Sequence, residues 1–182
     1  MTRILALALA AAVALPLPIA STALAQPAFY APARVDQMRA GPFWVTVFEG
    51  TPPNSSNARN SLSRGIRVFE KPHRSTFAAV AAQEIFEFDF KARGGMAAQL
   101  NKAQMEIISH EIESLVASRY GGYDLAAFEA KEAETLTRYA RLRGMPAGEI
   151  LARMRAARPI AERWLAQNRD VIRALVAYRF PR

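Results

Sequence analysis

The pattern of hydrophobic and polar positions changes once along the chain, from an alternation of period two to a helical spacing. Residues 43–50 (FWVTVFEG) and 65–72 (GIRVFEKP) alternate and are rich in β-branched and aromatic residues, which is typical of strands. A polar loop with two prolines separates them, so we expect an antiparallel hairpin with a long connection. From Ser75 onward the apolar residues recur at helical spacing. We therefore expect an α+β fold that is mostly α: a two-stranded hairpin followed by about five helices.

Glycine, proline and capping residues set the helix boundaries that we expect. Pairs of glycines at 94–95 and 121–122 end the first two helices. Asp124 is a suitable N-cap for the third helix, and Pro159 suits the first turn of the last. Together these signals predict helices at about 75–93, 97–120, 125–143, 147–157 and 159–179.

The first 25 residues are typical of an export signal rather than of a folded domain. An apolar run from Ile4 to Leu15 follows one positive charge, and Ala23-Leu24-Ala25 is a small-x-small cleavage sequence. The run is too short to span a bilayer as a helix. We expect cleavage of the 1–25 signal peptide after Ala25, and a periplasmic or secreted protein with no membrane span. We expect residues 26–42 to form an extended N-terminal segment, and residues 43–182 to form a single, mostly helical domain.

Positive charge is concentrated at the C-terminal end of the chain. Residues 138–182 carry eleven Arg, no Lys and three acids, a net charge of +8, whereas residues 26–137 have a net charge of −1. Such a region can attract anionic polymers or lipid headgroups, although two solvated helix faces produce the same composition. We keep both interpretations open, and we expect no nucleic acid as partner because an exported protein rarely meets it.

Three successive helices each place a carboxylate within an apolar stripe. Glu84, Glu111 and Glu132 fall among apolar positions when each helix is drawn at its natural period. A buried carboxylate is costly unless it is paired or bound to a metal. The neighbouring His110 adds an imidazole, and this ligand set suits zinc, manganese or iron. A buried Glu–Arg network would satisfy the same groups without a function, and we favour that network for Glu84 and Glu87.

The order of these residues resembles the active site of zincin metallopeptidases of the gluzincin type. The motifs are His110-Glu111-x-x-Ser114 on one expected helix and Phe128-Glu129-x-x-Glu132-Ala133 on the next. In that family the histidine binds zinc, the glutamate after it is the general base, and a glutamate on a following helix is the third ligand. The resemblance covers about 75–143 and implies that His110 and Glu132 bind zinc (Zn²⁺) and that Glu111 is the catalytic base.

Ser114 departs from the family pattern, because a second zinc-binding histidine stands at that position in zincins. The resemblance then leaves two protein ligands instead of three. Glu113, three residues after His110, or Glu87 from the preceding helix could replace the missing ligand, or the site has decayed and only the fold persists. We expect a degenerate or atypical metal-dependent peptidase that acts on periplasmic peptides or proteins. The alternative is a non-catalytic periplasmic helical protein that binds a protein, an anionic polymer or an envelope surface.

Overall fold

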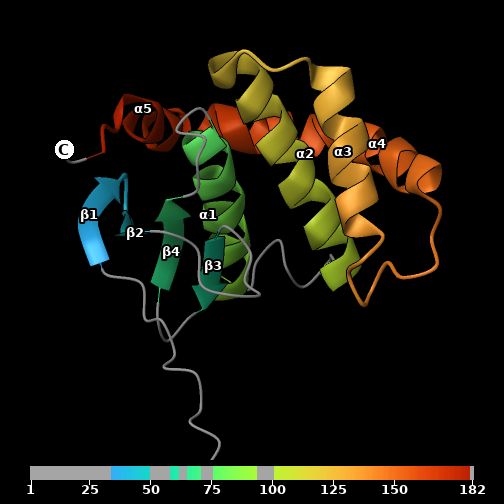
Figure 1. The fold of residues 1–182 in the computed structure, drawn as a ribbon, viewed down its shortest axis with the longest axis horizontal. Coiled ribbons are helices and arrows are strands. Elements are labelled where there is room, and N and C mark those ends of the chain that lie inside the picture. The colour runs from blue at the N-terminus through green and yellow to red at the C-terminus, as the bar shows by residue number, and fades with distance from the viewer. Residues whose placement is uncertain (1–33, 50–57, 62–64, 71–75, 94–100, 181–182) are drawn as a thin grey trace, which may run out of the picture.

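The computed structural model describes residues 34–49, 58–61, 65–70, 76–93 and 101–180, and these form a four-stranded sheet and five helices (Figure 1). The strands are β1 (Arg34–Ala40), β2 (Phe43–Glu49), β3 (Ala58–Ser61) and β4 (Gly65–Glu70). The helices are α1 (Phe77–Arg93), α2 (Lys102–Gly121), α3 (Leu125–Leu136), α4 (Ala147–Gln167) and α5 (Arg169–Ala177). The expected class, α+β and mostly α, is confirmed for these residues.

The predicted two-stranded hairpin is wrong. The two strands correspond to β2 and β4, which lie side by side but run parallel, and the strand order is β1-β2-β4-β3. The antiparallel partners are β1 for β2 and β3 for β4. Both missed strands lie at the edges of the sheet and are largely polar, so they lack the apolar alternation that marks a strand in the sequence. Since β1 lies within 26–42, the folded domain begins before residue 43.

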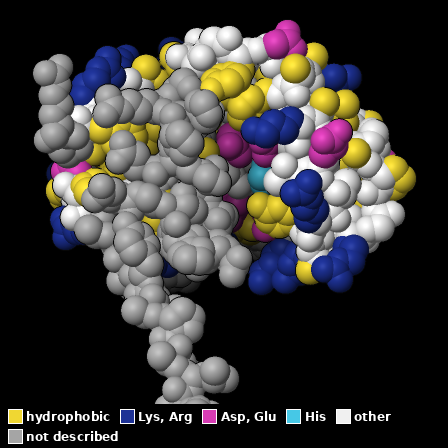
Figure 2. Space-filling model, in the orientation of Figure 1, with side chains coloured by type: hydrophobic (Ala, Val, Ile, Leu, Met, Phe, Trp, Pro, Cys, Tyr) yellow, Lys and Arg dark blue, Asp and Glu magenta, His cyan; other side chains and the backbone are white. Residues whose placement is uncertain are grey.

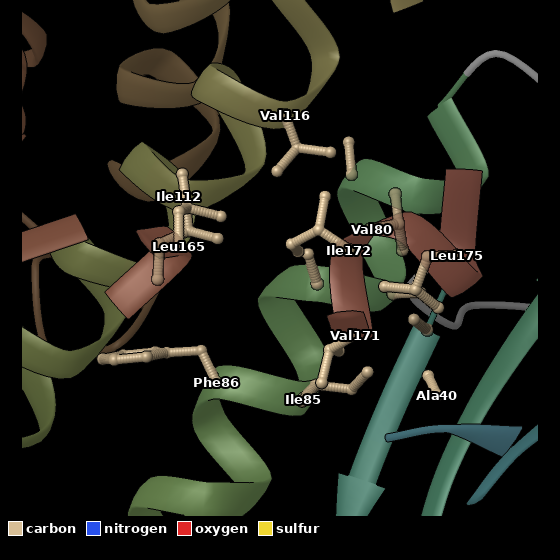
Figure 3. Packing of buried hydrophobic residues seen from close by; sticks show 14 of the residues in the cluster. Ala40, Val80, Ile85, Phe86, Ile112, Val116, Leu165, Val171, Ile172 and Leu175 are labelled. Carbon is tan, nitrogen blue, oxygen red and sulfur yellow. The ribbon is translucent and has the colours of Figure 1, made fainter. Parts of the chain in front are cut away.

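One face of the sheet is apolar and packs against the helices. Val45 and Val47 of β2 are in register with Ile66 and Val68 of β4, and all four side chains are buried. Figure 3 shows Ile85 and Phe86 of α1 within the core beyond that face, next to side chains from α2, α4 and α5. Burial of this apolar surface is the main stabilising term that holds the sheet to the helical layer.

The sheet is also joined to the last helix. The turn between β1 and β2 contains Gly41, whose φ of 59° is in the left-handed region, where glycine is favoured. A Cβ atom at this position would lie 2.8 Å from Cγ2 of Val171 in α5. Glycine therefore permits both the tight turn and the close approach of α5 to the sheet.

The central helix of the domain is α2. It lies between α1, α3 and α4, and every side chain from Ile107 to Ala117 is buried. Asn101 and Gln104 form a capping box at its N-terminus, and Gly122, with φ of 73°, follows its end. Because α2 is covered on all sides, its polar residues are buried together with its apolar ones. This burial sets up the candidate site.

Three of the predicted helix boundaries are wrong. α2 begins at Lys102, after its cap Asn101, rather than near 97. α3 ends at Leu136 rather than near 143, and turns continue to Met145. α4 runs continuously through Pro159, where the sequence predicted a new helix to begin. A proline inside a helix removes one backbone hydrogen bond, but Pro159 is exposed, so water can reach the unpaired carbonyl. Ser75, the expected cap of the first helix, lies outside the described residues.

No helix in the described part of the chain is long and apolar enough to cross a bilayer. Residues 1–33 lie outside that part, so the signal peptide and its cleavage after Ala25 stay predictions.

Candidate metal centre

Three buried side chains from α2 and α3 meet at one point. His110 Nδ1 lies 2.7 Å from Oε2 of Glu132 and 3.5 Å from Oε2 of Glu113. One potential ligand atom from each residue lies within 4.8 Å of the others, and all three residues are buried. An imidazole and two carboxylates are a ligand set that suits zinc and other divalent transition metals.

The secondary structure explains why these residues meet. His110 and Glu113 are three residues apart on α2, so they share one face of the helix. Asp124 caps α3 by accepting a hydrogen bond from the Ala127 amide, which fixes where that helix begins. Phe128 and Leu136 pack inward from α3, and Glu132, which lies between them in the sequence, is turned towards α2.

The charges of the carboxylates govern the protonation of His110. Burial by itself lowers the pKa of an imidazole. The hydrogen bond that His110 donates to Glu132 and the negative charges of Glu113 and Glu132 outweigh this effect and raise the pKa of His110 to about 9. Burial and the nearby charge of Glu132 raise the pKa of Glu113. Without a cation, the cluster therefore keeps protons at neutral pH that a metal ion would displace.

The cluster forms part of the wall of a cavity of about 730 Å³. Figure 2 shows the histidine side chain in a hollow between acidic and basic side chains. The cavity is also lined by Glu84, Glu87 and Glu106, by the basic residues Arg67, Lys91, Lys131 and Arg138, and by Ala58 of the edge strand β3. The volume lies within the range of small-molecule sites, so a ligand could approach the cluster directly.

Two further side chains hold the imidazole in place. The Gln83 amide lies 3.2 Å from His110 Nε2, so both ring nitrogens of the histidine have polar neighbours. The Tyr139 ring meets the imidazole edge-on, with 5.6 Å between the ring centroids. Contacts around a metal-binding histidine fix its orientation and its tautomer. Gln83 comes from α1 and Tyr139 from the turns after α3, so three parts of the chain orient one ring.

Glu111, the expected catalytic base, does not join this cluster. Its side chain is fully buried, and its Oε1 accepts a hydrogen bond of 2.7 Å from Nε of Arg158 in α4. Arg158 also pairs with Glu129, whose second oxygen accepts from Nε of Arg155 at 2.9 Å. Glu111 is not among the described residues that line the cavity. The buried Glu–Arg network considered from the sequence thus exists, but around Glu111 and Glu129.

The remaining candidates have other partners. The Ser114 hydroxyl donates to the backbone oxygen of His110 at 2.8 Å, so it points along its own helix. Glu87 lines the cavity and pairs with Lys91 at 3.2 Å, and it also accepts a hydrogen bond from Ser109. Its partners in the described part of the chain include a lysine and the Ser109 hydroxyl, and the arginine network that we favoured for Glu84 and Glu87 stays a prediction. Glu84 is buried in the same wall.

Sequence reasoning missed the residues that surround the cluster. Gln83 and Tyr139 carry no motif, and their roles depend on how α1 and the turns after α3 pack on α2. Glu129 was not among the carboxylates that the sequence placed within an apolar stripe, but it is buried. The arginines at 155 and 158 were read only as part of a basic region. Because α4 continues through Pro159, these arginines lie three residues apart on one helix and can face the same neighbour.

Comparison with known proteins adds no assignment: no family model, no curated protein and no solved structure matches this chain.

Proposed function

We propose that this protein is an exported, zincin-like metalloprotein that binds zinc through His110, Glu113 and Glu132 and hydrolyses peptides at that site. The observation that carries the proposal is the convergence of these three buried ligand groups in the wall of an open cavity. Glu113 takes the place of the histidine that Ser114 replaces in the family pattern.

The chemistry of the three ligands supports zinc. A neutral imidazole and two carboxylates balance the charge of a divalent cation, and three protein ligands leave a fourth, open position of the kind that catalytic zinc sites have. A zinc ion in such a site lowers the pKa of its bound water to roughly 7. The contact between His110 and Glu132 also fits the zincin resemblance, in which the first histidine and the glutamate of a following helix share one ion.

The edge strand next to the cavity supports a peptide as substrate. β3 is at one end of the sheet order, and its first residue, Ala58, lines the same cavity as the three ligands. Extended peptides commonly bind at a sheet edge, and β3 is the end strand of the sheet among the described residues. A peptide bound along β3 would lie beside the cluster.

The position of Glu111 changes the assignment of the base. Because Arg158 holds its carboxylate away from the cavity, we assign proton transfer to Glu106, which lines the cavity one turn before His110 on α2. Burial raises the pKa of the Glu106 carboxyl, which brings it closer to the value that suits a general base at neutral pH. Glu106 accepts the proton of the attacking water and delivers it to the leaving amine.

Metal content tests the proposal. The chain is produced with its export signal, purified without chelators or a histidine tag, and its bound metals are measured by mass spectrometry. We expect one zinc per chain, and its loss in His110→Gln and in Glu132→Gln. The matched control is Glu87→Gln, which removes a carboxylate from the same cavity and keeps the zinc. A folded wild-type chain without metal, even after incubation with zinc, contradicts the proposal.

A non-catalytic role is the second candidate, and one observation favours it. The 2.7 Å contact of His110 with Glu132 satisfies both groups as an ion pair without any cation. In that case His110→Gln lowers the stability of the fold and changes no metal content, which separates the two candidates in the same experiment.

A further inference from the structure

Two groups of arginines on or beside the C-terminal helices differ in their surroundings. Arg155 and Arg158 hold buried carboxylates inside the fold. A second group lines a groove where α4, α5 and the C-terminal end of α2 meet, and none of the residues that line this groove belongs to the metal cluster. The arginines of this groove are Arg119, Arg169, Arg173 and Arg179.

Acidic residues do not balance the charge of this groove. Glu162 is its one acidic lining residue among those that the structure describes, and it pairs with Arg119 at 2.8 Å. Arg173 has a pair with Asp170 at 3.3 Å, but that carboxylate is 88 % exposed, and such pairs contribute little. Arg169 has no acidic partner in the described part of the chain. The groove therefore has a net positive charge and can accept an anion.

The floor of the same groove is apolar. Leu165 of α4 and Ile172 of α5, both labelled in Figure 3, form its buried part, and Val176 is half-buried. Tyr120 stands at the end of α2 with 56 % of its surface exposed. Tyrosines with an apolar ring and a polar tip are common where a protein meets a membrane interface. An anion that fits this groove should thus have an aliphatic part.

The size of the groove distinguishes between occupants. Its volume is about 500 Å³, which suits one small ligand, whereas a stable protein partner buries roughly 800 Å² on each side. The planar guanidinium binds phosphate oxygens in pairs. We propose that this groove binds the phosphate headgroup and adjoining methylene groups of one anionic phospholipid, and so places the protein on an anionic membrane surface.

Vesicle sedimentation with the full chain tests the proposal. The probes are vesicles of phosphatidylcholine alone and vesicles that also contain phosphatidylglycerol. The variant Arg169→Gln/Arg173→Gln removes two arginines of the groove. The control variant Arg143→Gln/Arg163→Gln removes the same charge from exposed positions outside the groove. A third variant, Tyr120→Ser, removes the exposed ring without changing the charge.

We expect binding to the anionic vesicles only, reduced roughly 25-fold in the groove variant, since each of the two arginines near an anionic surface contributes roughly a factor of five. The control variant should lose distinctly less, and Tyr120→Ser should bind more weakly than wild type. Equal losses in both double variants, or equal binding to the two vesicle types, overturn the proposal. So does binding of soluble polyglutamate with no binding to vesicles, which would indicate an acidic peptide as the ligand.

Discussion

His110 on α2 and Glu132 on α3 are joined by a contact of 2.7 Å between Nδ1 and Oε2, and Glu113 lies beside them. An imidazole and two carboxyl groups are thereby brought to one buried point, next to a cavity that a ligand can enter. The predictions below follow from this cluster and from the arginine network on the other side of α2.

Removal of metal should lower the thermal stability of the protein. Zinc at a hundredfold excess over its dissociation constant stabilises a folded protein by about 2.7 kcal/mol, which for a chain of this size raises Tm by about 5–10 °C. We expect this difference between zinc-loaded and chelator-treated wild type by calorimetry, and no difference in Glu132→Gln. A zinc-dependent shift that persists in Glu132→Gln would place the ion elsewhere.

Glu106 and Glu111 should have separable roles in catalysis. If a cleaved peptide is found, Glu106→Gln should lower kcat by a factor of about 10²–10⁴, the usual contribution of a general base, and should retain zinc. Glu111→Gln should leave kcat within a few-fold of wild type and lower the stability, because it weakens the bond to Arg158. The opposite result would restore the assignment that the zincin resemblance implies.

Arg158 should be a major determinant of stability. Its side chain joins Glu111 of α2 to Glu129 of α3, and Arg158→Ala leaves two buried carboxylates short of a partner. Loss of one member of a buried pair costs about 3–5 kcal/mol, and partial exposure of Arg158 places the expected loss at the lower end. Urea unfolding measures it. Arg153→Ala is the control, because its pair with Glu149 is half-exposed and should contribute at most about 1 kcal/mol.

The metal-free protein should become less stable as the pH rises above neutral. The pKa of His110 is about 9 in the folded state, against about 6.5 when unfolded, so its stabilising charge is fully present below pH 6.5 and is lost as the pH rises through 9. The raised pKa of Glu113 acts in the same direction, because the folded chain again holds more protons than the unfolded one.

This trend is measured by urea unfolding of chelator-treated protein between pH 6 and pH 9. The slope should be smaller in His110→Gln. A zinc-loaded sample should show a weaker decline or a rise, since binding requires deprotonated ligands. Stability of the metal-free wild type that increases over this range would contradict the electrostatics of the cluster.

Pro159→Ala should stabilise the protein. In the continuous helix α4, Pro159 leaves one backbone carbonyl without its donor, and proline inside a helix is up to about 3 kcal/mol less favourable than alanine. We expect an increase of about 1–3 kcal/mol in the free energy of unfolding, because the exposed site lessens the penalty. A neutral or destabilising effect would instead fit a helix that begins at Pro159.

The sequence is sufficient for elements whose signal is local. Helical periodicity and caps such as Asp124 and Gly122 gave the number of helices and most of their ends, because these signals act within one turn. The sequence was not sufficient for elements whose structure depends on a neighbouring element. The polar strands β1 and β3 exist through pairing with β2 and β4, and Pro159 is tolerated in α4 because tertiary packing outweighs a local preference.

For the site, polarity in an apolar stripe singled out Glu132 together with Glu84 and Glu111, and the zincin resemblance added His110 and, as one replacement for the missing histidine, Glu113. The sequence could not determine which carboxylate meets which cation, since that depends on the rotation of α2 between α3 and α4. Only the tertiary structure decided that Glu132 faces His110 and that Glu111, one residue further along α2, faces Arg158. Adjacent residues on a helix point about 100° apart. The candidate ligand His110 therefore faces α3, whereas its expected base, Glu111, faces α4.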